Sequence, residues 1–221
     1  MFIGHWAPAL VAATHPKAPG LGTLFLAGQL VDWAFFAFVL ADIEHLRLSP
    51  GISAMNPMDL YHMPFTHSLA GTMAFAAGFA ALIWLATRNR AGAAIGGAVV
   101  VSHWFADLLV HIPDLTLWGS PPKLGLGLWN HPALAMPLEL GLIALAFYVL
   151  IRARPPARAG FAALAVLATA MLAVQMVNWF GPQPTEPDLA AALVVFGTYA
   201  IIALIAAAAG RRLPPPKENS A

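Results

Sequence analysis

The stretch AGAAIGGAVVVSHWFADLLVHI, residues 91–112, decides the fold class of this chain. It is long enough to cross the hydrocarbon core of a membrane, which takes roughly 20 largely apolar residues as an α-helix. It also holds His103, Asp107 and His111, which follow one another at intervals of four residues. This interval places the three side chains on one stripe of a helix. Ionisable groups are costly inside a membrane segment, so they indicate a functional or structural site.

The composition of the whole chain also predicts a membrane protein. Of its 221 residues, 60% are hydrophobic and only 10% are charged, and the mean hydropathy is +0.74. Soluble domains carry about 25% charged residues. The net charge of +1 and the lack of a basic face interleaved with aromatic residues argue against a nucleic-acid partner. The absence of cysteine excludes disulfides, thiolate nucleophiles and cysteine-type zinc sites.

Six apolar stretches are long enough to span a membrane, and Pro, Gly and charged residues separate them. Continuous runs rich in Ala and Leu predict helices rather than the strands of a closed barrel. We therefore predict an all-α integral membrane protein with one membrane domain over residues 1–210, in which the site lies mainly within 1–140. A disordered cytoplasmic tail is predicted over 211–221. The expected spans are 21–41, 68–87, 91–112, 132–151, 160–180 and 188–209.

Residues 2–14, FIGHWAPALVAAT, are apolar but too short to cross a membrane. As a helix they would rise about 20 Å, at 1.5 Å per residue. Two interpretations stay open. In one, a half-helix packs against the first span and lifts His5 to the middle of the membrane. In the other, the segment is a helix that lies flat on the membrane surface.

The lysines and arginines predict the orientation, because cytoplasmic loops carry an excess of them. With the N-terminal region in the cytoplasm, nine of the eleven lie inside and only Arg47 and Lys123 lie outside. This orientation predicts a protein of the bacterial inner membrane with both termini in the cytoplasm. Loops 42–67 and 113–131 then face the exterior. The nine inner residues are Lys17, Arg88, Arg90, Arg152, Arg154, Arg158, Arg211, Arg212 and Lys217.

With this orientation, polar residues of several spans fall within one depth zone, from mid-membrane to the outer face. Asp32 lies about halfway along the first span, His67 opens the second from outside, and Glu139 lies about two turns into the fourth. His103 and Asp107 form the sharpest pattern, since imidazole and carboxylate one turn apart suit zinc, manganese or iron. The alternatives for this pair are a structural His–Asp hydrogen bond and a proton relay.

The segment YHMPFTHSL holds two further candidates, His62 and His67, which are five residues apart with a proline between them. This interval does not keep one helical face. We expect His62 on the loop and His67 in the first helical turn, with Thr66 as the N-cap. Alone, the pair is explained more readily by two interfacial histidines than by two metal ligands. Asp32 has an alternative too, as a buried carboxyl group that is hydrogen-bonded to Gln29.

Four short motifs in this chain resemble those of the YdjM-like family, the LexA-binding, inner-membrane-associated proteins thought to be metal-dependent hydrolases. One resembles the HRGFTHS-type box of that family, a second its Ser-His pair followed by Asp, a third its N-terminal Gly-His, and a fourth its Leu-Pro-Asp segment. The motifs keep the family's order over residues 1–115. They are His62 to Ser68, Ser102-His103 with Asp107, Gly4-His5, and Leu30-Val31-Asp32.

The resemblance implies a metal site, because the family's boxes are similar to those of zinc-dependent phospholipase C. It implies one to three divalent ions, with zinc as the first expectation. The chain departs from the family at Ala34 and Phe35, where an acidic residue and a histidine are usual, and at Met63, where the box has arginine. The implied ligands are His5, Asp32, His62, His67, His103 and Asp107.

Together these observations predict a membrane-embedded metal-dependent hydrolase that acts on a phosphoester or lipid-like substrate in the outer half of the membrane. Metal ions would activate a water and stabilise the displaced oxygens, and Glu139 or His111 would orient or deprotonate that water. Membrane lipids are the expected partners. One alternative is an ion- or proton-coupled transporter that uses the same buried His/Asp cluster. Another is a non-catalytic scaffold whose buried polar residues fix helix packing.

Overall fold

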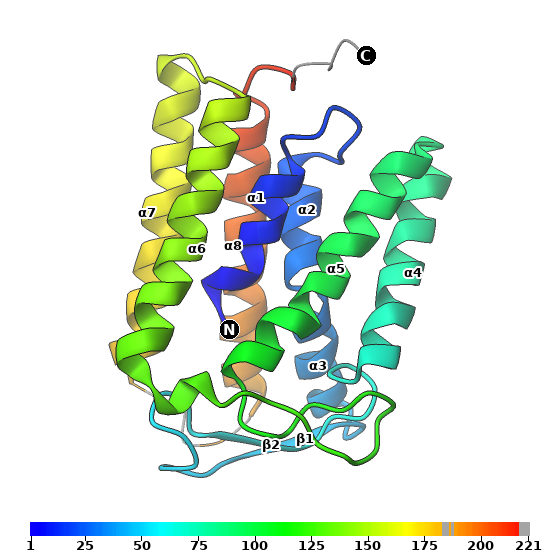
Figure 1. The fold of residues 1–221 in the computed structure, drawn as a ribbon, viewed down its shortest axis with the longest axis vertical. Coiled ribbons are helices and arrows are strands. Elements are labelled where there is room, and N and C mark those ends of the chain that lie inside the picture. Colours follow the sequence, from blue (N-terminus) through cyan, green and yellow to red (C-terminus); the bar gives the residue numbers. More distant parts are fainter. Residues whose placement is uncertain (183–185, 187, 217–221) are drawn as a thin grey trace.

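The structure is a computed structural model that describes residues 1–182, 186 and 188–216, and it is mostly helical. Its long helices form a bundle with a small sheet at one end (Figure 1). In the described part of the chain, five helices are long and apolar enough to cross a membrane. Five of the six predicted stretches thus form single helices. These are α4 (Leu69–Thr87), α5 (Arg90–Val110), α6 (Pro132–Ala153), α7 (Arg158–Phe180) and α8 (Leu189–Gly210).

The remaining predicted stretch, 21–41, forms two helices, α2 (Leu21–Gly28) and α3 (Leu30–Leu40). They are bent by 51° relative to each other at a one-residue break. The last carbonyl groups of a helix have no partner within it. The Gly28 carbonyl is used instead by Nδ1 of His103, at 2.9 Å. Gly28 also lies so close to the His5 backbone that a Cβ atom would be 2.7 Å from the His5 carbonyl oxygen. The break between α2 and α3 is therefore in contact with two candidate site residues, His5 and His103.

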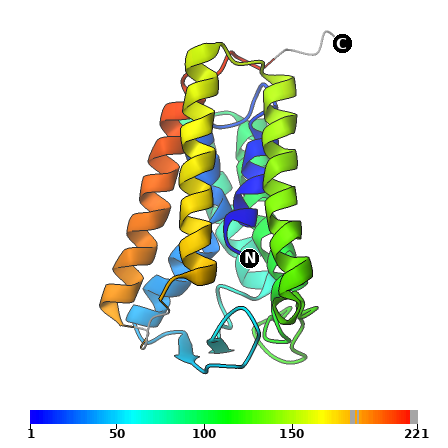
Figure 2. The same ribbon diagram turned by 90° about the vertical axis from the view of Figure 1, so that its left-hand side faces the viewer.

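The N-terminal segment lies inside the bundle, where the start of the chain is seen between the long helices in two perpendicular views (Figures 1 and 2). A short 3-10 helix, η1 (Ile3–Trp6), leads into α1 (Ala7–Ala12) and contacts α2, α5, α6 and α7. Every residue of η1 is buried, and the Trp6 indole donates to the Phe25 carbonyl at 3.1 Å. Of the two interpretations, the packed half-helix is the one observed. Met1 lies in the interior rather than at either end of the bundle.

A β-hairpin covers one end of the bundle, and the prediction of an all-α protein did not include it. Strand β1 (His45–Leu48) pairs with β2 (Met58–His62) in antiparallel register. Leu46 and Leu60 of the hairpin are buried in a small hydrophobic cluster with Trp104 of α5. The hairpin is therefore fixed to the bundle through its apolar side chains.

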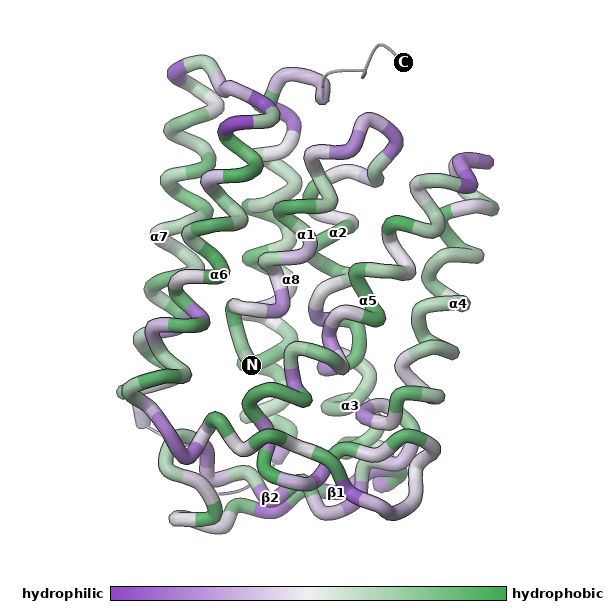
Figure 3. The backbone as a smooth tube through the Cα atoms, in the orientation of Figure 1, coloured by the Kyte–Doolittle hydropathy of each residue, from purple (hydrophilic) through white to green (hydrophobic). Residues whose placement is uncertain are grey.

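Hydropathy separates the helices from the two ends of the bundle. Figure 3 shows hydrophobic residues along the helices and hydrophilic ones mainly at the turns. The turn after α1, the α4–α5 turn, the α6–α7 turn and the end of α8 all lie opposite the hairpin (Figure 1). A second 3-10 helix, η2 (Leu128–Asn130), precedes α6 at the hairpin end. In the predicted tail, Leu213 is buried, and residues 217–221 lie outside the described residues.

Candidate metal centre

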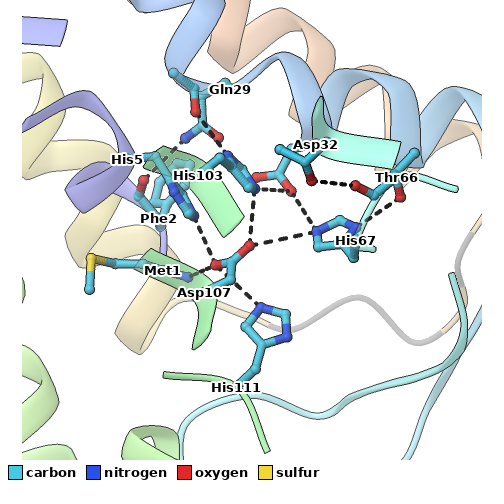
Figure 4. Close-up of polar contacts among 12 residues, drawn as sticks. Met1, Phe2, His5, Gln29, Asp32, Thr66, His67, His103, Asp107 and His111 are labelled. Atoms are coloured by element: carbon cyan, nitrogen blue, oxygen red, sulfur yellow. Dashed lines mark hydrogen bonds and ion pairs between the residues drawn. The ribbon is translucent and has the colours of Figure 1, made fainter. Parts of the chain in front are cut away.

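Six of the predicted site residues meet in the interior of the bundle (Figure 4). Separate parts of the chain supply them, and five of the six are buried, the exception being the half-buried Asp32. The four-residue intervals along α5 place its members on one face, as predicted. The residues are His5 on η1, Asp32 on α3, His67 before α4, His103 and Asp107 on α5, and His111 just after α5.

Among the described residues, two groups of three side chains hold ligand atoms that lie within 4.8 Å of one another. The first group is His5, His103 and Asp107. Nε2 of His5 lies 3.0 Å from Oδ1 of Asp107, and Nε2 of His103 lies 3.0 Å from Oδ2. The two imidazole rings stack with their centroids 3.7 Å apart. One carboxylate is therefore shared between two stacked histidines and the N-terminal ammonium of Met1, which lies 2.6 Å from Oδ1.

The second group is Asp32, His67 and His103. Oδ1 of Asp32 lies 3.5 Å from Nε2 of His67 and 3.4 Å from Nε2 of His103. His67 Nε2 is also 3.7 Å from Oδ2 of Asp107, which connects the two groups. His103 belongs to both groups through the same nitrogen, which has a single lone pair. One ion can bind this nitrogen, so any second ion has to use the other ligands.

Hydrogen bonds to Nδ1 fix the ring orientation of two histidines. His103 Nδ1 lies 2.9 Å from the Gly28 carbonyl oxygen, and His111 Nδ1 lies 2.9 Å from Oδ1 of Asp114. Both partners are acceptors, so each bond requires the proton on Nδ1. The lone pair is then on Nε2, which faces the centre of the cluster. Histidines that bind metals are usually oriented in this way.

His67 is oriented through two further side chains. Its Nδ1 lies 2.9 Å from Thr66 Oγ1, which donates to Oε2 of Glu44 at 2.5 Å. Glu44 is fully buried, and its Oε1 accepts from the backbone N–H groups of Phe65 and Thr66. The expected N-cap at Thr66 is not observed, because Ser68 caps α4. The Thr66 hydroxyl is thereby left to connect Glu44 to His67.

Apart from the His–Asp contacts given above, three buried atoms at the centre have no hydrogen-bond partner among the described residues. They are Nε2 of His5, Nε2 of His103 and Oδ2 of Asp107. Buried polar atoms are nearly always satisfied by hydrogen bonds in folded proteins. A cation shared by these atoms would satisfy them, because neutral imidazole and carboxylate are both zinc ligands. The residues at the centre therefore fit a divalent metal ion.

Glu139 lies beside the cluster but is engaged by other groups. Its Oε1 accepts from the backbone N–H groups of Phe2 at 2.6 Å and Gly4 at 2.9 Å. Its Oε2 accepts from the side-chain amide of Gln175 at 3.2 Å. These bonds hold η1 in place, and with it His5. The contacts favour a positioning role for Glu139 over the predicted activation of a water.

His111 is the better placed of the two predicted water-activating residues. Its Nε2 lies 3.3 Å from Oδ1 of Asp107, and its ring packs on Trp129 with centroids 4.1 Å apart. Both His111 and Trp129 line a cavity that opens onto the cluster. Because Asp114 holds the opposite nitrogen, His111 presents Nε2 to the space in which a substrate would bind.

His62 is not brought into the cluster. It is exposed at the end of β2, where it is paired with His45 of β1, and their ring centroids are 5.2 Å apart. It belongs to neither group of ligand atoms found among the described residues. Of the two histidines in the HMPFTHS motif, only His67 is part of the candidate metal centre.

The alternative interpretation of Asp32 was a buried carboxyl group hydrogen-bonded to Gln29, and this hydrogen bond is not observed between the two described side chains. Its Oδ2 accepts from the Tyr199 hydroxyl at 3.1 Å. The Gln29 side-chain amide donates instead to the Phe2 carbonyl at 3.1 Å. Gln29 therefore supports the N-terminal segment, and Oδ1 of Asp32 faces the two histidines.

A cavity of about 720 Å³ opens onto the cluster. Asp32, His67, Asp107 and His111 line its polar end, while most of the wall consists of apolar side chains from α3, the hairpin, α7 and α8. Ligand sites for drug-sized molecules have volumes of roughly 300–1,000 Å³. An organic substrate can therefore be accommodated next to the candidate metal ligands.

The residues that orient the histidines were not predicted as parts of the site. Thr66 has a local signal, since it directly precedes His67 within the family-like box. Asp114 follows His111 by three residues, a spacing that allows side chains in a turn to meet. Gly28 and Glu44 act from other segments of the chain, and their own neighbours in the sequence do not indicate their partners.

We expect Thr66→Val to weaken zinc binding by about 10–100-fold, the usual cost of losing a group that orients a metal-binding histidine. Valine keeps the shape of threonine but cannot connect Glu44 to His67. Titration of the metal-free protein with zinc in competition with a chelator measures the affinity. Thr72→Val is the matched control, because it removes a buried hydroxyl that bonds the Thr66 carbonyl and not the His67 ring. Equal affinities of the two variants would contradict the orienting role.

No protein-family model matches this sequence, and comparisons with curated proteins and with solved structures find no significant match. The resemblance of four motifs to the YdjM-like family therefore stays a prediction. The function of this chain has to be argued from the residues of the site.

Proposed function

We propose that this chain is a polytopic protein of the bacterial inner membrane, in which α2 and α3 together form one bent span. Five long apolar helices and this bent pair support six spans. Lipid-facing positions are apolar, as at Leu82, Leu145 and Leu204, which are 65%, 59% and 68% exposed. The basic turns gather opposite the hairpin, and the excess of positive charge assigns that end to the cytoplasm. The cluster and the hairpin then belong to the outer half of the membrane.

We propose further that the protein is a metal-dependent hydrolase acting on a phosphoester or lipid-like substrate. One observation carries this proposal: histidine Nε2 atoms and two aspartate carboxylates converge at the polar end of a cavity large enough for a substrate. The resemblance to the YdjM-like family supports the same class of activity. The residues that would hold the ion are His5, Asp32, His67, His103 and Asp107.

The chemistry follows from this set of donors. A bound divalent ion lowers the pKa of a water and stabilises negative charge on the displaced oxygens of a phosphoester. His111 Nε2 is placed to accept a proton at the cavity wall, and Asp114 stabilises the resulting imidazolium through Nδ1. The apolar walls keep bulk water away from the reacting groups.

The metal content and the phosphoesterase activity of purified protein test this proposal. Purified without chelator, the wild type is expected to retain zinc and to hydrolyse 4-nitrophenyl phosphate, whereas Asp107→Asn loses both because Asp107 contacts four histidines. Asp59→Asn, at a hairpin carboxylate paired with Arg47, is the control and keeps both.

Two other outcomes would contradict the hydrolase, and a third would contradict the site assigned to it. A wild-type protein that binds no metal would favour a scaffold whose polar residues fix helix packing. Bound metal without hydrolysis would favour an ion-coupled transporter that uses the same cluster. Hydrolysis that persists in Asp107→Asn would place the activity outside the candidate metal centre.

A further inference from the structure

The cavity at the polar cluster extends to the neighbouring helices α7 and α8, and residues of both line it. Each of these helices lines it with one stripe of residues at helical spacing. On α7 the stripe is Ala173, Val174, Val177 and Asn178, beside which Trp179 also lines the cavity, and on α8 it is Ala191, Val194, Val195, Thr198 and Tyr199. The facing surfaces are mainly small and apolar. This part of the cavity can therefore accommodate a hydrocarbon chain.

Two residues of these stripes show where the cavity opens. Val177 on α7 and Val194 on α8 both line the cavity, and they are also 65% and 70% exposed. The wall at this point is thus also the outer, lipid-facing surface of the bundle. In a bilayer, an opening between two spanning helices faces the acyl chains and not the water.

The route along the bundle axis is bounded by different side chains. At the hairpin end, Leu46, Met58 and Leu60 line the cavity, and Leu46 and Leu60 are buried. The hairpin therefore presents an apolar inner surface between the cavity and the aqueous side. A ligand of this cavity contacts apolar walls on both α7–α8 and the hairpin, and meets polar groups at the cluster.

Transfer of a hydrocarbon chain from the bilayer into this cavity gives little hydrophobic gain, because lipid tails are as apolar as the side chains that replace them. Affinity must therefore come from the polar end of the ligand at the candidate metal centre. A molecule with one polar group and an apolar chain satisfies both halves of the cavity. A small, fully water-soluble phosphoester satisfies only the polar half.

We propose that the opening between α7 and α8 admits the hydrocarbon chain of a membrane lipid, whose polar end then lies against Asp107 and His111. The hydrolysis of that polar end rests on the proposed function, whereas the binding site for the hydrocarbon chain, called the lipid seat below, rests on the cavity alone. This inference narrows the substrate class to lipids of the leaflet at the hairpin end.

Photo-crosslinking in lipid nanodiscs tests the seat independently of activity. The probe is a phosphatidic acid that carries a diazirine on one acyl chain, and the full-length protein is used. Cross-links are expected to be enriched on residues 173–178 of α7 and 191–198 of α8. Val194→Trp fills the opening and is expected to lower the yield there by about tenfold, the effect of ~1.4 kcal/mol in binding.

Leu193→Trp is the matched control. Leu193 is 58% exposed and adjacent to Val194, but it does not line the cavity. This variant is expected to keep the wild-type cross-linking yield. Unchanged elution in gel filtration and an unchanged Tm of both variants show that the bundle is intact. Cross-links spread evenly over the lipid-facing surfaces, or equal yields in the two variants, would overturn the proposal.

Hydrolysis of 4-nitrophenyl phosphate separates this proposal from the proposed function. Enriched cross-links in a wild type that hydrolyses nothing would support the lipid seat and contradict the hydrolase. Hydrolysis of the soluble ester without enriched cross-links would contradict the lipid seat and support the hydrolase. With both proposals correct, Val194→Trp lowers turnover of the lipid by a larger factor than turnover of the soluble ester.

Discussion

Replacing His103 by alanine is expected to abolish zinc binding. Its Nε2 is the one atom shared by both groups of candidate ligands, at 3.0 Å from Asp107 and 3.4 Å from Asp32. The affinity should fall by more than the roughly 10–100-fold that the loss of an orienting neighbour costs. Zinc analysis of the purified variant, followed by titration in competition with a chelator, measures the loss.

Thermal unfolding gives a second readout for His103→Ala. Zinc at 100 times its Kd should stabilise the wild type by about 2.7 kcal/mol, because the ligand binds only the folded state. The variant should show no zinc-dependent rise in Tm. His62→Ala is the control and keeps both effects, since His62 is exposed on the hairpin. Full zinc binding by His103→Ala would rule out the metal centre described here, as would its loss in His62→Ala.

Replacing Glu139 by alanine is expected to destabilise the protein by about 3 kcal/mol, because each buried donor left without its acceptor costs ~1–3 kcal/mol. The donors affected are the backbone N–H groups of Phe2 and Gly4 and the side-chain amide of Gln175. Titration with a denaturing detergent, without added metal, measures the free energy of unfolding. Zinc affinity should fall as well, since η1 carries His5.

Glu139→Gln distinguishes the hydrogen bonds of this side chain from its charge. A glutamine oxygen can still accept from Phe2 and Gly4, so most of the stability should return. If Glu139→Ala unfolds at the same detergent concentration as the wild type, the carboxylate does not anchor the N-terminal segment. A variant that is stable and binds zinc but lacks turnover would point instead to the water-activating role expected from the sequence.

The spans were predictable because hydropathy over some 20 residues is a strong signal. The bend between α2 and α3 was not, since Gly28 and Gln29 interrupt the apolar run too briefly. The hairpin also escaped prediction. Its strands, His45–Leu48 and Met58–His62, contain no Val, Ile or Thr, and residues 49–57 between them are too many for a two-residue turn.

The candidate site was predictable to the extent that its members follow a local spacing. His103, Asp107 and His111 recur every four residues along α5 and the residue that ends it, so their common face could be derived. The role of Glu139 could not be derived in this way. Its partners are backbone N–H groups 137 and 135 residues away. Almost every residue carries such a group, so the sequence does not indicate which ones a carboxylate will bind.

The insertion of the first residues into the bundle also sets an order of assembly. The backbone N–H groups of Phe2 and Gly4 donate to Glu139 on α6, and that of Ile3 donates to Gln175 on α7, 172 residues later. Contacts this distant in the chain form late in folding. During synthesis these three backbone N–H groups therefore have no partner until α6 and α7 have been made, although η1 can already contact α2 and α5. The five clustered ligand candidates lie within the first 107 residues, yet the centre closes only after α7 has been made.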